Sequence, residues 1–282
     1  MDENVIARFI RDDGEELIVD ETDWGALTIN GADAANYEIF TEKKAVGDGD
    51  YVTGSRVKSR NLEIAADVMN PINNDTLRHH AVSFFNPKHR FRIYLTYMGI
   101  TRFIDGLLSA FKCPAQYIHT KQKFSCFFIC SDPFFNDVDD FGQDIASETP
   151  RWGFPYMDHP TYKTLISVYN FERVVRFAYD GDVPTYFRAK ITADGEVINP
   201  KLIKDNSFVR LLDTLQAGDI VEIDFEQATI TKNGENVLAK VDRASDFTVM
   251  MTPGDNTISF NADVGENVMH VRLFYNKKYL GV

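Results

Sequence analysis

Three acidic side chains in the last third of the sequence have the spacing that a paired-carboxylate catalyst could use. Glu222, Asp224 and Glu226 are separated by single apolar residues, so all three would point to one side of a strand. Glycosidases place two such carboxylates across a cleft. The other side of this strand is apolar, which is typical of a sheet with one solvated face. We therefore predict a solvated face and no catalytic residue. The enzymatic alternative requires turnover that depends on Glu222 or Asp224.

Two Asp-Gly-Asp triplets, at residues 48–50 and 180–182, could begin a calcium-binding loop. A helix–loop–helix calcium site needs Glu at the twelfth position of its loop, where this chain has Ser59 and Ile191. Glycine between aspartates is also the composition of a tight turn. The triplets are therefore predicted to be turns.

Histidines and cysteines are present but do not form a ligand set. His79 and His80 are neighbours on a predicted helix and diverge, so they cannot hold one metal ion from a single face. Cys126 and Cys130 lie four residues apart in a predicted strand, about 13 Å, which is too far for a disulfide. With Cys113 they are expected to be reduced core residues. Phosphate-loop, dinucleotide-binding and hydrolase motifs are also missing from the sequence, so neither a cofactor nor a metal is predicted.

A small basic cluster is formed by Arg56, Lys58 and Arg60. Their alternate spacing on a strand or extended arm would put all three on one face. Such charges can protect an exposed strand edge from pairing with other chains. Alternatively, they belong to an arm that docks on an acidic neighbouring subunit, and we take these three residues as the candidate interface site.

Composition limits the classes of function. The chain has 282 residues, of which 44% are hydrophobic, and a formal net charge of −12. This length suits one large or two ordinary domains. An acidic surface repels phosphates and anionic lipids, which argues against a nucleic-acid or membrane binder. The amino terminus has neither a basic region nor an apolar signal segment, which predicts synthesis in the cytoplasm.

Hydrophobic alternation and turn signals predict the elements that position these residues. In the first half we expect hairpins at residues 5–19 and 91–105 and a central strand at 124–130. One helix is predicted to begin near residues 73–75, where the side chain of Asn73, Asn74 or Asp75 could cap it, and to end before Pro87. From residue 161 onward, turn signals between alternating strands favour an antiparallel sandwich.

Residues 137–160 interrupt this pattern with several Asp and Pro residues and little periodicity, as expected of a connection between domains. The sequence therefore predicts a mainly β protein in three parts. An N-terminal β-sandwich domain with one α-helix spans residues 1–136, a connecting segment spans 137–160, and a C-terminal antiparallel β-sandwich spans 161–282.

An ordered set of short motifs extends over nearly the whole chain. In the first domain these are GDYVTGSR at 49–56, SFFNP at 83–87, LTYMG at 95–99 and SDPFF at 131–135. In the second domain they are GEVINP at 195–200, NGEN at 233–236, PGDN at 253–256 and YLGV at 279–282. Together they resemble the distal tail proteins of siphophages that infect Gram-positive hosts. No single motif is specific, but their order is.

This resemblance implies a structural hub of the baseplate rather than an enzyme. The second domain would be galectin-like, and six copies would form a homo-hexameric ring, with Arg56, Lys58 and Arg60 in a ring-interface arm. The ring would join the tail tube protein to a tail-associated lysin or fibre hub and carry receptor-binding proteins for host attachment. DNA would pass through the lumen without specific binding, and no membrane would be bound. The protein would reside in the virion, at the tail tip, after assembly in the host cytoplasm.

A carbohydrate-binding module for host cell-wall polysaccharide is the alternative, because sandwich folds are common lectin scaffolds. Sugar sites need exposed aromatic rings, and Trp24 and Trp152 lie outside the C-terminal strands. Tyr179, Tyr186 and Phe187 could substitute, but they could equally belong to the core. This alternative predicts saturable binding of wall polysaccharide by residues 161–282.

Overall fold

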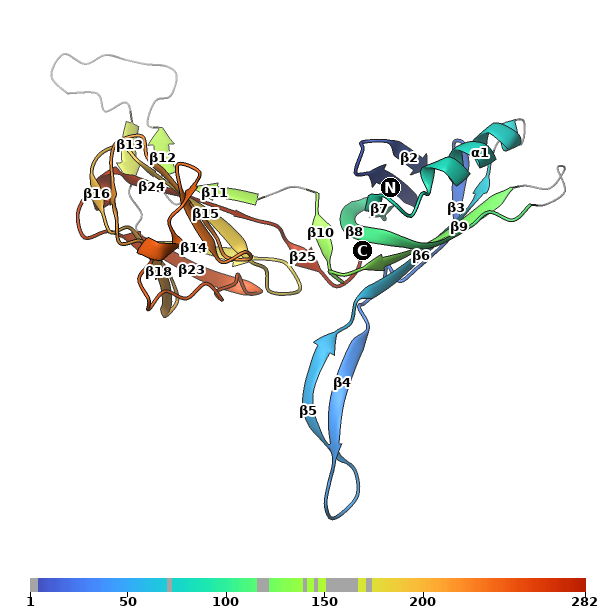
Figure 1. Cartoon of the computed structure of the whole chain (residues 1–282), viewed down its shortest axis with the longest axis horizontal. Helices are drawn as coiled ribbons and strands as arrows, with labels where there is room; N and C mark the ends of the chain where they lie inside the picture. The colour runs from blue at the N-terminus through green and yellow to red at the C-terminus, as the bar shows by residue number, and fades with distance from the viewer. Residues whose placement is uncertain are drawn as a thin grey trace. The chain divides into compact units, whose positions relative to one another are not determined.

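The structure is a computed structural model that describes residues 5–69, 73–115, 122–138, 141–144, 147–150, 167–170 and 174–282. The chain divides into two compact units. Unit 1 comprises Met1–Val138 and Lys278–Val282, and unit 2 comprises Asp139–Lys277. Both are built mainly from antiparallel strands (Figure 1), so the predicted mainly β fold is confirmed.

Unit 1 contains a sheet with the strand order β2-β1-β7-β8-β9-β6-β3, in which β10 also pairs with β8 and β25 pairs with β10. A separate two-stranded sheet is formed by β4 and β5. The bounds are β1 Ile6–Arg11, β2 Glu16–Val19, β3 Trp24–Asn30, β4 Tyr37–Lys43, β5 Asp50–Val57, β6 Arg60–Val68, α1 Asn74–Phe84, β7 Arg90–Tyr97, β8 Ile100–Lys112, β9 Lys123–Cys130, β10 Phe135–Asp137 and β25 Lys278–Tyr279.

The core of unit 1 lies on one face of this sheet, because apolar residues alternate along its strands. In β6, Leu62 and Ile64 are buried, while Glu63 between them is more exposed. Helix α1 packs on the same core through Ala81 and Phe84. It begins at Asn74, and of the three predicted capping residues Asn73 is at the N-cap position, where its side chain makes no capping hydrogen bond. Burial of the apolar stripe therefore positions the helix more than its cap does.

Two predicted features of unit 1 are confirmed by the strand pairing. Strands β1 and β2 form the first hairpin, and β7 and β8 form the second. The turn of the second hairpin has positive φ at both Met98 and Gly99, the backbone twist that suits a two-residue hairpin loop. The predicted central strand is β9, which pairs with β8 on one side and β6 on the other.

The three cysteines are free thiols. Cys126 and Cys130 are fully buried in β9, and burial raises the pKa of the Cys130 thiol to about 12. A thiol with such a high pKa remains protonated near neutral pH and is a poor nucleophile or metal ligand. These side chains therefore act as small core residues, as the sequence predicted.

Unit 2 contains one sheet with the order β11-β24-β15-β20-β21-β22 and another with the order β14-β23-β17-β18. The bounds are β11 Phe141–Asp144, β12 Ser147–Pro150, β13 Ser167–Asn170, β14 Val174–Tyr179, β15 Phe187–Ala193, β16 Val197–Ile198, β17 Lys201–Lys204, β18 Ser207–Arg210, β19 Thr214–Leu215, β20 Ile220–Asp224, β21 Thr229–Lys232, β22 Glu235–Asn236, η2 Leu238–Lys240, β23 Gly254–Asn261, η3 Glu266–Val268 and β24 Met269–Tyr275. Small two-stranded sheets are formed by β12 with β13 and by β16 with β19.

Side chains from both larger sheets of unit 2 contribute to a single core. Val221 and Ile223 of β20 are buried, and Glu222 between them is exposed. The same alternation in β24 buries Val271 and Leu273 and leaves the intervening residues toward solvent. Strands β20 and β24 therefore each have one face in the core and one face toward solvent.

Much of the predicted connecting segment 137–160 lies outside the described residues. Of the described part, Phe141–Asp144 forms β11, which pairs with β24 in unit 2. At the other end of the chain, Lys278–Val282 belongs to unit 1, not to the unit that contains most of the predicted second domain. The chain thus enters unit 2 from unit 1 and returns to unit 1.

Candidate assembly surfaces

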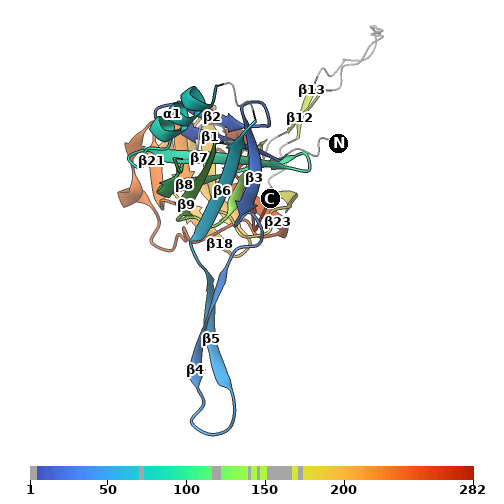
Figure 2. The same ribbon diagram turned by 90° about the vertical axis from the view of Figure 1, so that its right-hand side faces the viewer.

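A two-stranded hairpin, β4–β5, projects from the rest of unit 1 (Figures 1 and 2). We call residues 37–57 the arm. Its large apolar side chains are uncovered within the chain: Ile39 is 62% exposed, Tyr51 61% and Val52 70%. An isolated two-stranded hairpin is marginally stable in water, and exposed apolar clusters commonly mark interaction sites. The arm therefore has the properties of a segment that is covered by another chain.

Two residues of the predicted basic cluster lie on or beside the arm. The Arg56 Nε donates to Glu38 Oε2 at 2.8 Å, and the Lys58 Nζ lies 3.2 Å from Glu38 Oε1. The hydrogen bond from Arg56, followed by that from Lys58, lowers the pKa of Glu38. Both cationic side chains are at least half exposed, so they remain accessible to a partner.

The third residue of that cluster, Arg60, lies elsewhere. Strand β5 ends at Val57 and β6 begins at Arg60, so the alternation of one strand does not continue across this break. Arg60 is only 4% exposed. The structure therefore brings Arg56 and Lys58 together around Glu38 and separates Arg60 from them.

The buried guanidinium group of Arg60 donates hydrogen bonds to four backbone carbonyls. It reaches Pro133 O at 2.7 Å, Asp33 O at 2.7 Å and Leu280 O at 2.6 Å, and it also donates to Gly31 O. The central carbon of the Arg60 guanidinium group lies 4.8 Å from the centre of the Phe135 ring. Burial lowers the pKa of Arg60, but an arginine side chain stays charged. The carbonyl dipoles therefore stabilise a charge that joins three distant segments.

The C-terminal residues Lys278–Val282 are held in unit 1 by these and similar contacts, which we call the C-terminal clamp. Tyr279 pairs with Phe135 of β10, and Lys278 Nζ lies 2.6 Å from Asp132 Oδ2. Arg102 donates to Gly281 O, and its guanidinium carbon lies 3.5 Å from the centre of the Tyr279 ring. Val282 N donates to the Ala32 carbonyl at 3.0 Å, which completes the clamp.

Glycine suits position 281 of the clamp because the backbone there is crowded. A Cβ atom on Gly281 would lie 3.0 Å from Ala32 O and 3.1 Å from the backbone of Asp33. The motifs SDPFF and YLGV lie far apart in the sequence, at residues 131–135 and 279–282. The structure shows that they meet, and only long-range contacts could have revealed this.

A groove of about 800 Å³ lies on the exterior of unit 1, beside β1, β7, β8 and β9. Leu107 and Ile129 contribute exposed apolar surface to it, at 50% and 45% exposure. Arg92 forms two hydrogen bonds to Asp105 in the same wall, at 2.7 and 3.0 Å, and these bonds raise the pKa of Arg92. The groove and the arm are thus two different exposed surfaces of one unit.

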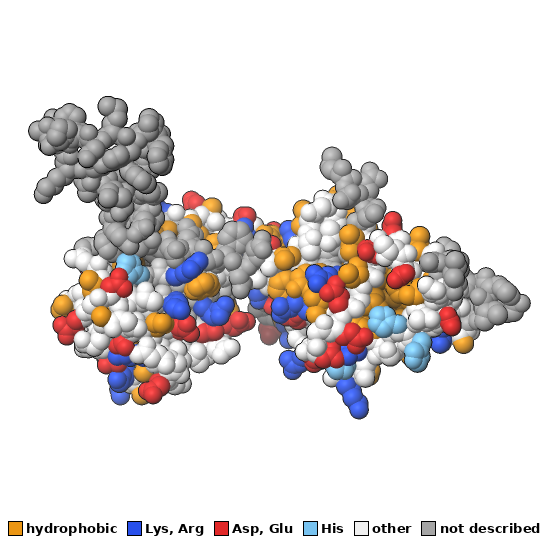
Figure 3. All heavy atoms as spheres, turned by 90° about the horizontal axis from the view of Figure 1, so that it is seen from above, with side chains coloured by type: hydrophobic (Ala, Val, Ile, Leu, Met, Phe, Trp, Pro, Cys, Tyr) orange, Lys and Arg blue, Asp and Glu red, His pale blue; other side chains and the backbone are white. Residues whose placement is uncertain are grey.

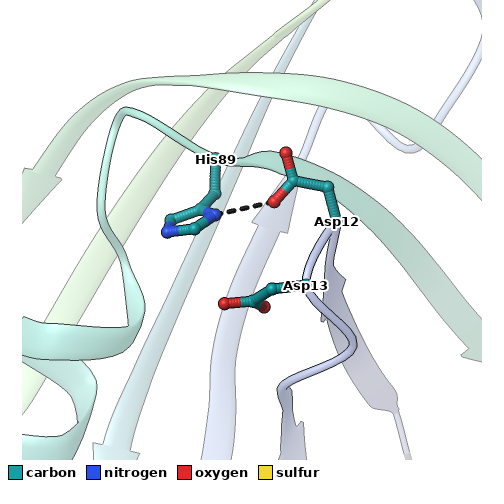
Figure 4. A group of neighbouring side chains, drawn as sticks. All are labelled: Asp12, Asp13 and His89. Carbon is teal, nitrogen blue, oxygen red and sulfur yellow. Dashed lines mark hydrogen bonds and ion pairs between the residues drawn. The ribbon is translucent and has the colours of Figure 1, made fainter.

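Asp12, Asp13 and His89 form a cluster whose ligand atoms lie within 4.8 Å of one another (Figure 4). The His89 Nδ1 lies 2.6 Å from Asp12 Oδ1, and this bond lowers the pKa of Asp12. Asp13 is bonded to Arg11, which lowers the pKa of Asp13 to about 2. The Arg11 guanidinium group already supplies a positive charge to this carboxylate. The cluster therefore acts as a polar contact between the β1–β2 turn and the segment before β7.

The sequence candidates for catalysis are in the outer face of unit 2. Glu222 is exposed, and Asp224 accepts hydrogen bonds from the backbone N–H groups of Glu226 and Gln227, both at 2.9 Å. Asp224 therefore closes the turn after β20. In the two Asp-Gly-Asp triplets, Asp180 forms a salt bridge with Lys277 at 2.8 Å, and Asp50 is the first residue of β5. These contacts are structural ones.

A family model for the C-terminal domain of siphovirus-type tail components matches residues 180–279. Residues 180–279 are therefore similar to the C-terminal domain of siphovirus-type tail components. The resemblance indicated by the sequence motifs is thereby confirmed. No helix among the described residues is both long and apolar enough to cross a membrane.

Solved structures extend the similarity beyond the tail component domain. One is a crystal structure of the SPP1 Dit protein (gp 19.1), described as a paradigm of the hub adsorption apparatus in phages that infect Gram-positive bacteria. It has 12% sequence identity and a TM-score of 0.69, covering 97% of this chain and 99% of that one. Another is the phage P2 baseplate in its activated conformation with Ca, with 9% identity, a TM-score of 0.50 and coverage of 96% and 97%. At these identities the similarity shows a shared fold. A comparison with curated protein sequences gives no match.

Proposed function

We propose that the protein is a structural hub of a siphophage tail tip. Six copies form a ring that joins the tail tube to baseplate or fibre components, and the protein is not an enzyme. The observation that carries this proposal is the tail component domain at residues 180–279, in a chain whose fold resembles SPP1 Dit over 97% of its length. The protein then resides in the virion after assembly in the host cytoplasm.

The exposed surfaces of unit 1 support a ring. A closed ring needs heterologous contacts, in which two different patches of each subunit meet. The arm offers exposed Ile39, Tyr51 and Val52, and a neighbouring subunit would cover them. Arg56 and Lys58 at its base would add charge contacts with an acidic neighbour. Arg60 contributes indirectly, because it fixes the point where the arm leaves the sheet.

The remaining partners follow from the same proposal. The ring meets the tail tube protein on one face and a tail-associated lysin or fibre hub on the other. Unit 2 is available to hold receptor-binding proteins. The net charge of −12 suits a lumen through which DNA passes without specific binding, because like charges repel.

The test is the mass of the full chain, alone and with its tube protein, measured by light scattering behind size exclusion. Electron microscopy of the heaviest species would show its symmetry. A six-fold ring in either sample supports the hub. A monomer at high concentration in both samples contradicts it.

Carbohydrate binding is a second candidate role for unit 2. Tyr179 and Phe187 are poorly placed to bind a sugar, because they are only 1% and 2% exposed. A different aromatic residue, Phe274, lies on the outer face of β24 between two arginines. This observation favours a binding role that accompanies the hub instead of replacing it.

A further inference from the structure

The two faces of the arm carry different side chains. On one face, the strand register places Ile39 opposite Ser55 and Thr41 opposite Val52. The register shift in the arm skips Thr53 of β5, so the alternation along β4 is kept. Because paired residues and alternate residues of a strand share a face, these side chains point to the same side. We call this side the apolar face, and its large side chains are Tyr37, Ile39, Val52 and Val57.

The opposite face of the arm is covered by cations of the arm itself. The guanidinium carbon of Arg56 lies 5.5 Å from the centre of the Phe40 ring, and Lys44 Nζ lies 5.4 Å from the centre of the Tyr51 ring. A cation over a ring is a favourable contact within the single chain. By contrast, three of the four large side chains of the apolar face are more than half exposed. The apolar face is therefore the side of the arm that gains more from contact with another molecule.

The groove of unit 1 combines an apolar pair with charges that are already neutralised. Leu107 of β8 and Ile129 of β9 are paired in the sheet, and both are about half exposed. Arg92 in the same lining is bonded to Asp105. A polyanion would have to compete with that carboxylate for the arginine, whereas an apolar strand face would leave the bond intact. The groove is therefore better suited to an apolar segment of protein.

Both surfaces are close to neutral in a strongly acidic chain. The groove lining contains three arginines and three aspartates, and arm residues 37–57 contain four acidic and three basic side chains. Two copies that each carry a net charge of −12 repel one another, so they approach most easily where local charges balance. Hydrophobic side chains of unit 1, at the right of Figure 3, likewise lie among both acidic and basic ones. This balance favours a second copy of the chain as the occupant of the groove.

We propose that the apolar face of the arm packs into the groove of a second copy. The arm and the groove are different patches of one unit, which is what a head-to-tail contact requires. The arm projects from the rest of its own unit (Figures 1 and 2), so its apolar face is presented to another molecule. Ile39 and Val52 then cover Leu107 and Ile129. This inference rests on the proposed hub, because it names the two surfaces that meet between neighbours in the ring.

Photo-crosslinking of the full chain identifies the surface that the arm contacts. Val52 is replaced by benzoylphenylalanine, and isotopically labelled and unlabelled copies are mixed so that adducts between copies are recognised by mass. We expect adducts with the groove segments of β8 and β9 in another copy. The control carries the same group at Tyr51, which is also exposed but lies on the opposite face, and should lose these adducts. Equal yields from both positions, or adducts within one copy, overturn the proposal.

Two double variants test whether the surfaces are complementary. Ile39→Ser with Val52→Ser alters the arm, and Leu107→Ser with Ile129→Ser alters the groove, all at exposed sites. Each variant alone should lose the ring. An equal mixture should form a dimer with one copy of each variant and stop there, because one intact arm meets one intact groove. A mixture that stays monomeric at concentrations where the parent assembles overturns the proposal, as does a mixture that restores the ring.

A matched control and the parent chain separate this contact from the hub itself. Val82→Ser with Ile100→Ser removes exposed apolar side chains of unit 1 outside both surfaces and should leave the ring intact. Loss of the ring in this control equal to that in the groove variant would overturn the specific contact. Parent rings whose arm adducts lie on another surface overturn this contact and leave the hub standing. A parent that stays monomeric with and without its tube protein contradicts both.

Discussion

Two arginines four residues apart in the sequence have opposite environments. Arg60 is buried, and its donors are directed at backbone carbonyls of three segments of its own unit. Arg56 is 66% exposed, and its neighbours on the arm include apolar side chains that no other part of unit 1 covers. Arg60 therefore stabilises one folded unit, whereas the arm carries exposed apolar surface and exposed cations. Similar side chains in one basic cluster thus divide between a buried and an exposed environment.

The largest effect is expected at Arg60. Arg60→Met should lower the free energy of unfolding by about 3 kcal/mol or more, because several buried carbonyls lose their donor. Chemical denaturation followed by fluorescence measures this change. Arg56→Met is the control and should stay within about 0.5 kcal/mol of the parent, as expected for a surface substitution. Equal losses in the two variants would remove the contrast between the two environments.

The C-terminal clamp should stabilise unit 1, although most of unit 1 lies far from residues 278–282 in the sequence. Removal of residues 280–282 deletes acceptors of Arg60 and Arg102 and should cost about 2–4 kcal/mol. Hydrogen exchange should accelerate in unit 1 and change little in unit 2. Removal of Val282 alone deletes the hydrogen bond to Ala32 and should cost only about 1 kcal/mol. Faster exchange confined to unit 2 would contradict this assignment.

Charge reversal on the arm should affect assembly and leave folding intact. Arg56→Glu with Lys58→Glu replaces attraction to Glu38 by repulsion at an exposed site, so stability should change by less than about 1 kcal/mol. We expect loss of the ring by light scattering. The control, Lys88→Glu with Lys123→Glu, makes the same charge change at exposed sites of unit 1 away from the arm. Rings that survive the arm reversal would exclude these cations from the interface.

Apolar substitutions refine this test, because they leave the charges in place. Ile39→Ser with Val52→Ser should prevent assembly without lowering the denaturation midpoint, since both side chains are exposed in the single chain. A lower midpoint together with intact rings would mean that the arm packs within its own subunit.

The smallest effect is expected at the Asp13 carboxylate. Its pKa is lowered from 3.8 to about 2 when folded, chiefly by the Arg11 hydrogen bond, so its contribution to stability is present above pH 4 and disappears as the pH falls through about 2. Asp13→Asn should therefore be slightly less stable than the parent at pH 7 and equal to it near pH 2. Denaturation midpoints across this range measure the difference. A difference that does not vary with pH would rule out the ion pair as its cause.

The sequence predicted the elements whose cause is local. Alternation identified β20, turn residues identified the hairpin at Met98 and Gly99, and a proline marked the end of the helix region. It also identified the resemblance to siphophage distal tail proteins, from the order of short motifs along the chain. The apolar residues of the arm gave no such signal, since exposure depends on what the rest of the fold fails to cover.

Long-range contacts explain what sequence reasoning missed. Arg60 and Leu280 are separated by 220 positions, and no local pattern distinguishes a cation that binds distant carbonyls from one that remains in solvent. The groove was hidden for a related reason. Leu107 and Ile129 come from β8 and β9, whose register only the fold provides.

The return of the chain to unit 1 has a mechanical consequence. The backbone crosses between the units twice, near residue 138 and near residue 278, and the two crossings continue as the paired strands β10 and β25. A pulling force on unit 2 would be shared by both strands, with the salt bridge between Lys278 and Asp132 at their base. A single proteolytic cut at one crossing would leave the units joined through the other. The two units are therefore connected by two separate stretches of backbone, so unfolding of one connection alone would not separate them.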